Sequence, residues 1–498
     1  MPTTVRPPQS DPTQSHWPSA ATSLFRCPAC GGPFGADFAC ENCGNTVVTD
    51  DGILDFVAGT STTKLDDIDY DEVYSIDHDH SAELYQGLQR VAGTLWTQDF
   101  GSALEIGCGT GGLSMALFSQ IRTNAVVLTD ISPKMLRICR DRLTQNIRDK
   151  AKDFLYATFS GTESCFTPDS FDSCFGTAVV HHITDVPAFL RQVYTLLKPG
   201  GLAFFMEPVR GFHSALTATL ADIISVFIRN NTVAELDRSL MLNWMAEVHC
   251  NITNSGDIEV LAGREDKHYF IADEFLAWAE DAGFRQPTAL ICDPDPAGTH
   301  TIQAYLAQYK LSPQAASELA KAWPAHQQHY FGPLAASDRS PSYLFWMRKP
   351  TGPGKTGQSA RPPQPAPEPR RSHLHIWLHL QLENTREGRQ IIVKGWCVTD
   401  IPTASLQITI GTEKYRLPIY LPRPDVHQVI NAKSDFPAIC SLSSGIADTI
   451  DLPIGRGRGT NLELTFQVIL ANHQVVDAGS MTLRPGQGRQ VHHNVIPP

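Results

Sequence analysis

The stretch from Ser102 to Leu117, SALEIGCGTGGLSMAL, constrains the fold of this chain more than any other. It reads as a short apolar strand, a glycine-rich turn and the start of an amphipathic helix. Glycines let a backbone approach a ligand closely, because no Cβ stands in the way and a positive φ costs little. A helix that opens after such a turn directs backbone N–H groups and the positive end of its dipole at that ligand. Gly107, Gly109 and Gly112 also satisfy the dinucleotide fingerprint, so the turn alone leaves the cofactor open.

Length and composition limit the number of domains and the class of protein. The 498 residues suggest about three domains at ~150 residues each, and a hydrophobic content of 42% suffices for packed cores. The longest apolar runs fall short of the ~18 residues that a membrane span needs, and no signal peptide opens the chain, so we expect a soluble cytoplasmic protein. A net charge of −12 makes a nucleic-acid partner unlikely. The oligomeric state is left open.

Four of the twelve cysteines stand at metal-binding spacing. C-P-A-C carries Cys27 and Cys30, and C-E-N-C follows nine residues later with Cys40 and Cys43. Two such knuckles can place four thiolates around Zn²⁺, and a closed Cys₄ site is structural because it leaves no open coordination position. The alternative is chance spacing of buried cysteines. The segment CENCGNTVVTDDGILDF resembles the short zinc ribbon of tRNA-methyltransferase activator proteins, and we expect a ribbon over 23–58.

The segments on either side of the ribbon are less defined. Residues 1–22 hold five Pro and seven Ser or Thr, which predicts a disordered tail. Residues 64–95 begin acidic and become amphipathic. They form either a solvated helix that packs on the next domain or a lid in which Tyr70 and Tyr74 cover a cofactor.

Residues 99–210 alternate strand and helix patterns, which predicts a parallel α/β sheet. The second strand pattern, 125–129, ends at Asp130, and Ser132 and Pro133 are the expected cap and first turn of a helix. Asp130 lies 19 residues beyond Gly111, at the place where a carboxylate can accept ribose hydroxyls. A plain turn aspartate is the alternative. Further along, 171–183 is the expected fourth strand, and 196–208 reads as a helix end, a turn and a fifth strand.

Four segments in this order resemble successive motifs of class I S-adenosylmethionine-dependent methyltransferases. They are LEIGCGTGG, LTDISPKML, FDSCFGTAVVHHI and LLKPGGLAFFMEP. Nicotinamide dehydrogenases share only the first two. The resemblance covers about residues 70 to 349 and implies a Rossmann-like, seven-stranded methyltransferase sheet in a domain over 64–349. It also implies a helical insertion at about 211–268, where relatives build the acceptor pocket.

The resemblance implies a role for particular residues. Around the methionine part of the cofactor it places Glu105, Gly107, Gly109 and Gly111. Asp130 would hold the ribose and Ile131 would pack on the adenine. Ser160 stands where relatives carry an aspartate that accepts from the adenine amino group, so either a hydroxyl or the nearby Glu163 substitutes, or the adenine is held more loosely.

The C-terminal part changes its period. Residues 350–372 are rich in Pro and Gly and predict a linker, and 373–485 alternate at two, which predicts an all-β sandwich followed by a tail over 486–498. The runs GWCV (395–398), LPRPDV (421–426) and SSGI (443–446) are similar to those of modules of bacterial glycan-processing enzymes. Trp377, Trp396 and Tyr415 either stack on sugars or fill the core.

Methyl transfer to a hydroxyl benefits from a base. The candidates at the carboxyl edge of the sheet are His181, His182 and Glu207, and we favour His182, because relatives with one histidine in this motif keep it at the second place. Adjacent residues on a strand point opposite ways, so at most one histidine should face the pocket. The histidines could instead only pack or cap a helix. The expected function is methyl transfer to a small-molecule or glycan acceptor, with oxygen as the expected acceptor atom. The alternatives are an RNA-base methyltransferase and a cofactor-binding protein with an inactive core.

Overall fold

The computed structural model describes most of the chain, in two compact units. The first unit comprises Met1–Glu207, Asp273–Leu290 and Leu344–Thr356, and the second comprises the remainder. The described residues are 22–57, 78–147, 154–162, 165–261, 264–292, 294–308, 311–352, 374–384, 389–431, 437–452, 461–472, 474–484 and 488–495. The expected tail before Thr22, the tyrosines of the possible lid (Tyr70 and Tyr74), Glu163 and most of the linker fall outside these ranges.

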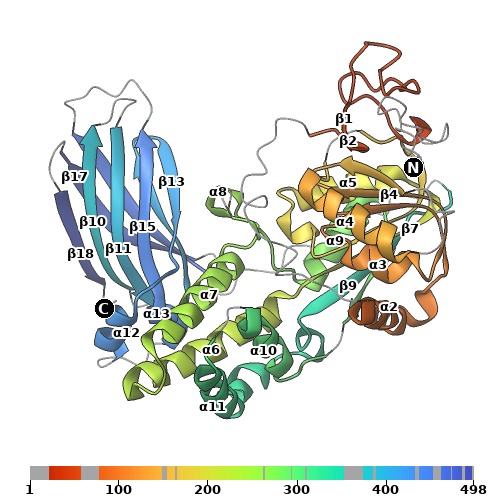
Figure 1. The fold of residues 1–498 in the computed structure, drawn as a ribbon. Helices are drawn as coiled ribbons and strands as arrows, with labels where there is room; N and C mark the ends of the chain where they lie inside the picture. Colours follow the sequence, from red (N-terminus) through yellow and green to blue (C-terminus); the bar gives the residue numbers. More distant parts are fainter. Residues whose placement is uncertain are drawn as a thin grey trace, which may run out of the picture. The chain divides into compact units, whose positions relative to one another are not determined.

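A nine-stranded sheet forms the core of the first unit (Figure 1). Its order is β1-β2-β5-β4-β3-β6-β7-β9-β8. The bounds are β1 (Val48–Asp50), β2 (Ile53–Asp55), β3 (Asp99–Ile106), β4 (Arg122–Asp130), β5 (Phe154–Thr158), β6 (Phe171–Thr177), β7 (Leu197–Pro208), β8 (Arg285–Ile291) and β9 (Ser342–Arg348). Strands β5, β4, β3, β6 and β7 pair in parallel, which confirms the expected Rossmann-like α/β core.

The sheet is wider than the seven strands expected from the sequence. The two additional strands, β1 and β2, come from the cysteine-rich segment, and β2 pairs in parallel with the edge strand β5, Ile53 opposite Tyr156. Asp51 and Gly52 turn the β1–β2 hairpin with φ of 51° and 78°, the backbone that a tight hairpin turn requires. The predicted ribbon is therefore built into the sheet rather than attached beside it.

Helices of the first unit flank this sheet. They are α2 (His78–Ala92), α3 (Gly112–Phe118), α4 (Pro133–Asn146), α5 (Val186–Leu196) and α9 (Ala272–Ala282). The expected cap of α4 is present, because Ser132 Oγ accepts the N–H of Met135 at 3.4 Å and Pro133 occupies the first turn. Between the sheet and its helices, the rings of Phe175, Phe204 and Trp346 stack in succession, with centroids 5.0 and 5.4 Å apart. This aromatic stack joins β6, β7 and β9.

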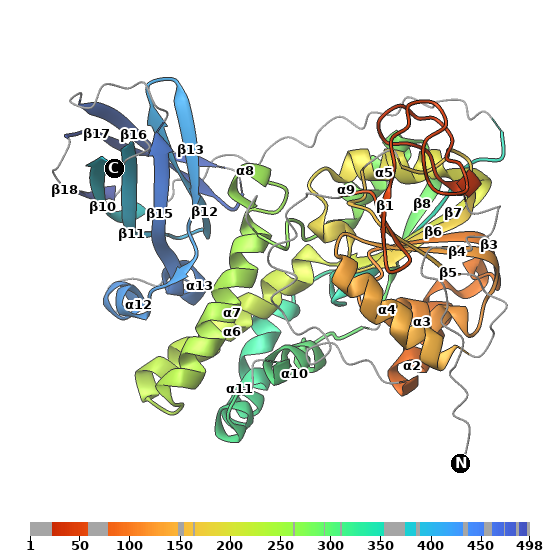
Figure 2. The same ribbon diagram turned by 45° about the horizontal axis from the view of Figure 1, so that its top comes forward.

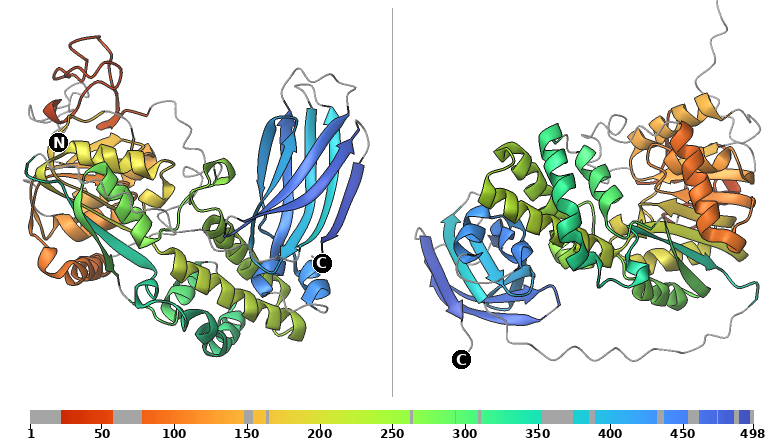
Figure 3. Two further views of the ribbon diagram at one scale, coloured as in Figure 1. Left: turned by 180° about the vertical axis from the view of Figure 1, so that it is seen from behind. Right: turned by 90° about the horizontal axis from the view of Figure 1, so that it is seen from below.

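The second unit begins with a group of helices. They are α6 (Arg210–Asn230), α7 (Glu235–Thr253), α8 (Ile258–Leu261), α10 (Thr299–Gln308) and α11 (Pro313–Phe331). Helices α7, α6 and α11 lie side by side (Figure 3), and the first two correspond to the expected helical insertion. Among the described residues, only α6 has the length and apolar composition of a membrane-spanning helix. Within its most apolar 18-residue window, 61% is buried inside the protein, as expected for a core helix.

Two antiparallel sheets complete the second unit (Figure 2). One has the order β14-β15-β11-β10-β18 and the other β13-β12-β16-β17. Their strands are β10 (Leu374–Asn384), β11 (Arg389–Thr399), β12 (Thr403–Ile410), β13 (Glu413–Pro418), β14 (Leu421–Pro422), β15 (Ser443–Leu452), β16 (Leu462–Leu470), β17 (Val475–Leu483) and β18 (Gly488–Val495). Apolar residues from both sheets share one buried cluster, an arrangement compatible with the expected β-sandwich. Strand β18 pairs with β10 and lies beyond the expected end of the sandwich, within the expected tail.

The three aromatic side chains of this region occupy different places. Trp377 and Trp396 lie directly opposite each other on β10 and β11, at half-buried positions that alternate with core residues. Tyr415 packs against the buried cluster. Of the two alternatives, sugar stacking and core packing, the structure favours core packing for Tyr415.

The helices and the sheets of the second unit are bonded to each other. Two short helices, α12 (Pro424–Asn431) and α13 (Ala438–Leu442), lie between strands of the sheets in the sequence. His427 of α12 bonds Ser225 of α6 and Ser441 of α13, each at 2.8 Å. The guanidinium of Arg264 lies 4.2 Å from the centroid of the Tyr420 ring. The expected insertion thus packs with the C-terminal sheets in one compact unit.

Candidate functional site

The candidate site lies at the carboxyl edge of the parallel strands in the first unit. Because β3, β4, β5, β6 and β7 run in the same direction, the residues that follow them meet at one edge of the sheet. In open α/β sheets, this edge binds ligands. The expected cofactor residues and the expected bases all come from these strand ends.

The glycine turn after β3 has the backbone that the sequence predicts. Gly107 has a φ of 66°, and a Cβ there would lie 2.3 Å from Val179 Cγ2, so no other residue fits. Gly111 has a φ of 93° and forms the N-cap of α3. Gly109, with a φ of 52°, would place a Cβ in open space. The turn therefore leaves room over its backbone beside the N-terminus of a helix.

Asp130, the last residue of β4, is 8% exposed and binds to the glycine turn. Its Oδ2 accepts the N–H of Gly109 and its Oδ1 accepts the N–H of Ser132, both at 2.9 Å. Burial raises the pKa of this carboxyl, while the backbone N–H groups oppose the rise. Each carboxylate oxygen can accept a second bond, so the pair can still accept two ribose hydroxyls.

Glu105 lies on β3, two residues before Gly107, and is 1% exposed. Ser114 of α3 donates its hydroxyl to Glu105 Oε2 at 2.7 Å. Desolvation raises the pKa of Glu105 to about 8, the Ser114 bond opposes this rise, and the charge of Asp130 adds to it. Two carboxyl groups buried close together form an environment that favours a positively charged ligand.

The residues expected to face adenine follow β4 and β5. Ile131 is half-buried directly after Asp130. The N–H of Phe159 donates to the carbonyl of Asp130 at 3.0 Å, and Ser160 follows it, half-buried, with its Oγ 3.5 Å from Thr162 Oγ1. The structure thus brings Ser160 and Ile131 to the same strand ends as Asp130.

The two histidines are not on a strand, and this part of the prediction is wrong. Strand β6 ends at Thr177, and His181 and His182 belong to a 3₁₀ turn, η3 (Val180–His182). Ala178 precedes the turn with a φ of 52°, a strained conformation for a non-glycine residue. The chain leaves the strand there, so the alternation of side chains along a strand does not apply.

Glu207, at the end of β7, organises this turn. Its Oε1 accepts the N–H groups of Val179 at 3.1 Å and Val180 at 2.8 Å, and its Oε2 accepts the N–H of His181 at 3.3 Å. The distance from His181 Nδ1 to Glu207 Oε2 is 2.7 Å. Because a carboxylate accepts there, the proton lies on Nδ1 in neutral His181, and Nε2 carries the lone pair. The carboxylate accepts four donors, so Glu207 is better suited to orient His181 than to take a proton.

His182 lies beside this pair and is half-buried. The centroids of the two imidazole rings are 3.9 Å apart. The imidazole that bonds the buried carboxylate of Glu207 at 2.7 Å is that of His181, whereas the sequence favoured His182 as the base.

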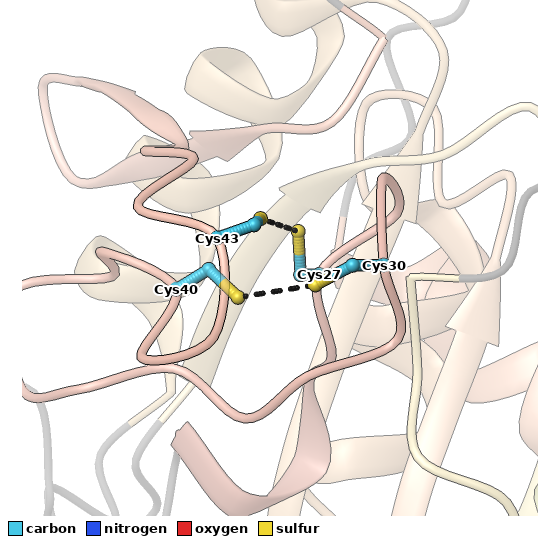
Figure 4. Close-up of side chains that lie close together, drawn as sticks. All are labelled: Cys27, Cys30, Cys40 and Cys43. Carbon is cyan, nitrogen blue, oxygen red and sulfur yellow. Dashed lines mark hydrogen bonds between the residues drawn. The ribbon is translucent and has the colours of Figure 1, made fainter.

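The four cysteines converge as their spacing predicts (Figure 4). The Sγ atoms of Cys27 and Cys43 are 3.7 Å apart, and those of Cys30 and Cys40 are 3.5 Å apart. All four sulfurs lie within 4.8 Å of one another, and none of these cysteines forms a disulfide. A tetrahedron with Zn–S bonds of ~2.3 Å has edges of ~3.8 Å, so the cluster is compatible with Zn²⁺.

Three residues of the site were missed at the level of sequence. Ser114 bonds Glu105, Arg142 donates to Thr110 Oγ1 of the glycine turn at 2.7 Å, and Thr158 bonds the cysteine-rich segment. All three lie in regular helices or strands, in which Ser, Arg and Thr are common residue types. Their partners lie 9, 32 and 103 residues away, outside their own helix or strand, so no local pattern marks them.

Comparisons with known proteins agree with this geometry. Residues 104–203 match a family described as "Methyltransferase domain". The chain is 34% identical over 122 residues to the ubiquinone/menaquinone biosynthesis C-methyltransferase UbiE of Xanthomonas oryzae, and the match covers 22% of this chain and 47% of that protein. It is 30% identical over 98 residues to the reducing polyketide synthase Preu2 of Preussia isomera, which covers 20% of this chain and 4% of that protein. The chain thus spans about half the length of the Xanthomonas relative.

A solved structure of Haemonchus contortus phosphoethanolamine N-methyltransferase 2 in complex with S-adenosyl-L-methionine is 18% identical. The similarity covers 57% of this chain and 59% of that one, with a TM-score of 0.34. Residues 104–203, which match the methyltransferase-domain family, lie in the parallel, Rossmann-like part of the sheet.

Proposed function

We propose that this protein transfers a methyl group from S-adenosylmethionine to a small-molecule acceptor. The observation that carries the proposal is the meeting of the glycine turn with Asp130, through the Gly109–Asp130 bond, within a matched methyltransferase domain. Glu105, Gly107, Gly109 and Gly111 are the proposed contacts of the methionine part. Asp130, Ile131 and Ser160 are the proposed contacts of the adenosine part.

When bound, S-adenosylmethionine supplies a methyl group on a sulfonium, which is already an activated electrophile. The residues of the chain then need to orient the acceptor and remove its proton, and orientation alone can supply ~7–11 kcal/mol. We assign the base to His181. Its Nε2 accepts the proton of the acceptor, and Glu207, through Nδ1, stabilises the imidazolium that forms.

The acceptor atom is oxygen in this proposal, on a small molecule or a glycan. Carbon is the second candidate, because the Xanthomonas relative is named a C-methyltransferase. Both need the loss of a proton, so both use His181. A methyl-transfer screen that includes sugars, phenols and acidic carbon compounds, followed by NMR of the product, identifies the acceptor atom.

Cofactor binding is tested with Asp130→Asn, which keeps the shape of the side chain and removes its charge. We expect affinity for S-adenosylmethionine to fall by ~10-fold or more, because losing a charged acceptor costs ~1.5–3 kcal/mol. Asp141→Asn, an exposed change on α4, is the matched control and should leave the affinity unchanged. Equal calorimetric affinities of the Asp130→Asn variant and the wild type would remove Asp130 from the site.

The base is tested with three variants once an acceptor is found. His181→Ala should lower kcat by ~10²–10⁴-fold with little change in cofactor affinity. Glu207→Gln should also lower kcat and move the acid limb of the pH profile, because the imidazole loses its carboxylate partner. His182→Ala should retain most turnover. If instead His182→Ala alone lost turnover, the assignment from the sequence would stand and that from the geometry would be wrong.

The other two functions lead to different outcomes. An RNA-base methyltransferase would bind RNA at moderate salt, which the acidic ribbon does not favour. A protein with an inactive core would bind S-adenosylmethionine and transfer its methyl group to no acceptor. We also propose that Cys27, Cys30, Cys40 and Cys43 hold one structural Zn²⁺ per chain, which metal analysis of freshly reduced protein would detect.

A further inference from the structure

The cysteine-rich segment and the cofactor side of the sheet are linked more closely than two separate modules would be. Here the ribbon denotes residues 22–57, and the adenine loop denotes residues 159–162, which carry Ser160. The ribbon bonds the chain directly before this loop and again just beyond it. These two connections are independent of each other.

The first connection is Thr158, the last residue of β5, which is fully buried. Its hydroxyl donates to Asp55 Oδ1 of β2 at 2.7 Å. The hydroxyl oxygen of Thr158 also accepts the N–H groups of Phe56 at 2.8 Å and Val57 at 3.2 Å. One hydroxyl therefore forms three hydrogen bonds to the ribbon, which uses its full capacity in a buried place.

This connection continues to the proposed ribose carboxylate. Thr158 stands opposite Asp130 in the β4–β5 register, and the next residue, Phe159, donates its N–H to the carbonyl of Asp130 at 3.0 Å. Asp130 in turn accepts the N–H of Gly109. A series of hydrogen bonds and one strand pairing thus leads from the ribbon to the glycine turn.

The second connection joins the start of the ribbon to residues beyond the loop. The N–H of Arg26 donates to the carbonyl of Cys165 at 3.0 Å, and the N–H of Thr167 donates to the carbonyl of Leu24 at 2.9 Å. Between these bonds, Phe25 and Phe166 pack with ring centroids 5.2 Å apart, and both are buried. Cys27, the first residue of the Cys₄ cluster, follows Arg26 directly.

The two connections are joined inside the ribbon. The ring of Phe25, from the second connection, stacks on that of Phe56, from the first, at 5.4 Å with planes 13° apart. The Cys₄ cluster holds the turns between Phe25 and the β1–β2 hairpin together. In the sequence, the four cysteines lie between Phe25 and Phe56, and the two connections flank the adenine loop.

We infer that the ribbon positions the adenine loop for the cofactor, with Thr158 as the positioning residue, so that metal bound at the Cys₄ cluster strengthens cofactor binding. The inference rests on the proposed function, because it needs the cofactor at this strand edge. Thr158 touches no part of the cofactor and acts through Phe159 and Asp130.

The test compares three variants by calorimetry with S-adenosylhomocysteine and with adenosine alone. Thr158→Val removes the hydroxyl at nearly constant volume, and affinity for both ligands should fall about ten-fold, since the loop contacts the adenosine half that they share. Thr158→Ser restores the hydroxyl and should bind within about two-fold of the wild type. Thr195→Val is the control on α5, where the hydroxyl donates to the carbonyl of Arg191 in the same helix, and it should change nothing.

Circular dichroism at the assay temperature verifies that each variant is folded. Equal affinity of the Thr158→Val variant and the wild type would overturn the inference. A loss for S-adenosylhomocysteine without a loss for adenosine would also overturn it.

The role of the metal is tested on the full chain. Zinc is removed with a chelator under reducing conditions, its release is quantified, and S-adenosylhomocysteine affinity is measured before removal, after removal and after zinc is added back. We expect the affinity to fall several-fold on removal and to return with zinc. Unchanged affinity in the metal-free chain would refute the coupling while leaving the proposed function intact. If the zinc-loaded wild type bound neither ligand, the proposed function itself would fail, and this inference with it.

Discussion

Glu105 is the residue of the candidate site whose charge depends most on its surroundings. Burial raises its pKa to about 8, so the carboxyl is mostly protonated near neutral pH. A sulfonium in this site favours the carboxylate, and binding of S-adenosylmethionine should therefore release a proton at about pH 7. The affinity of the protein for S-adenosylmethionine should rise between about pH 7 and pH 9. S-adenosylhomocysteine lacks the sulfonium charge and should show a smaller rise.

The same shift has a defined sign for stability. A carboxyl with a raised folded-state pKa contributes fully below its ordinary value of 4.5 and loses its contribution as pH rises through about 8. The ligand-free first unit should thus melt at a lower temperature at pH 9 than at pH 7.

The proton released on cofactor binding is counted by calorimetry in two buffers of different protonation enthalpy. Glu105→Gln is the control and should release none. Equal proton release with the two ligands would contradict this account.

Local signals predicted the strand end at Asp130, the glycine turn after β3 and the Ser132 cap, because each depends on neighbours within a few positions. The same reasoning failed for the histidines. The structure bonds His181 to Glu207, 26 residues away, and their turn departs from strand geometry at Ala178. A pattern of side-chain types holds no information about such a pairing. Thr158 was missed for the same reason, since its partner Asp55 is 103 residues away.

At the scale of elements, alternating polarity and turn residues predicted the parallel core and the C-terminal strands, because periodicity reports which face is buried. Strand partners were harder to predict. The β1–β2 hairpin extends the central sheet through two register pairs with β5, and β18 pairs with β10 along eight residues. Edge strands are short or polar, so their sequences resemble loops.

Strand β18 gives a prediction at this scale. A chain ending at residue 485 would lack the partner of β10 from Leu374 to Gln381 and would leave that edge unpaired. Unpaired edges pair with other chains, so this truncation should lower the melting temperature of the second unit and promote association. A chain ending at Val495 is the matched control and should behave as the full chain. Light scattering and thermal melting measure both effects, and identical behaviour of the two truncations would show that β18 adds nothing to the sheet.

At the scale of the whole molecule, the shift from helical to alternating patterns predicted a separate C-terminal domain. The structure instead groups helices α6, α7, α10 and α11 with the C-terminal sheets. The pairing of Ser225 with His427 spans 202 residues, and no local pattern could predict it. Such contacts make Pro208–Ala272 and Ile291–Tyr343 parts of one packed unit with the C-terminal sheets.

His427 allows this packing to be measured. The side chain is 3% exposed, and both ring nitrogens bond serine hydroxyls, on α6 and on α13. Desolvation, and secondarily the charge of Arg229, lowers its pKa to about 4. A base with a depressed folded-state pKa contributes stability above its ordinary value of 6.5, and that contribution is lost as pH falls toward about 4. The second unit should therefore lose stability over this interval.

His427→Leu tests this last prediction, because leucine fills the space but cannot bond either serine. Ser225 and Ser441 each lose one hydrogen bond, and we expect a loss of ~1 kcal/mol per bond. Hydrogen exchange should accelerate in peptides from α6 and α13 together, and the fall in stability between about pH 6.5 and pH 4 should become shallower. His329→Leu, at an exposed position of α11, is the control and should alter neither. Faster exchange in α13 with α6 unchanged would mean that the helices and the C-terminal sheets unfold independently.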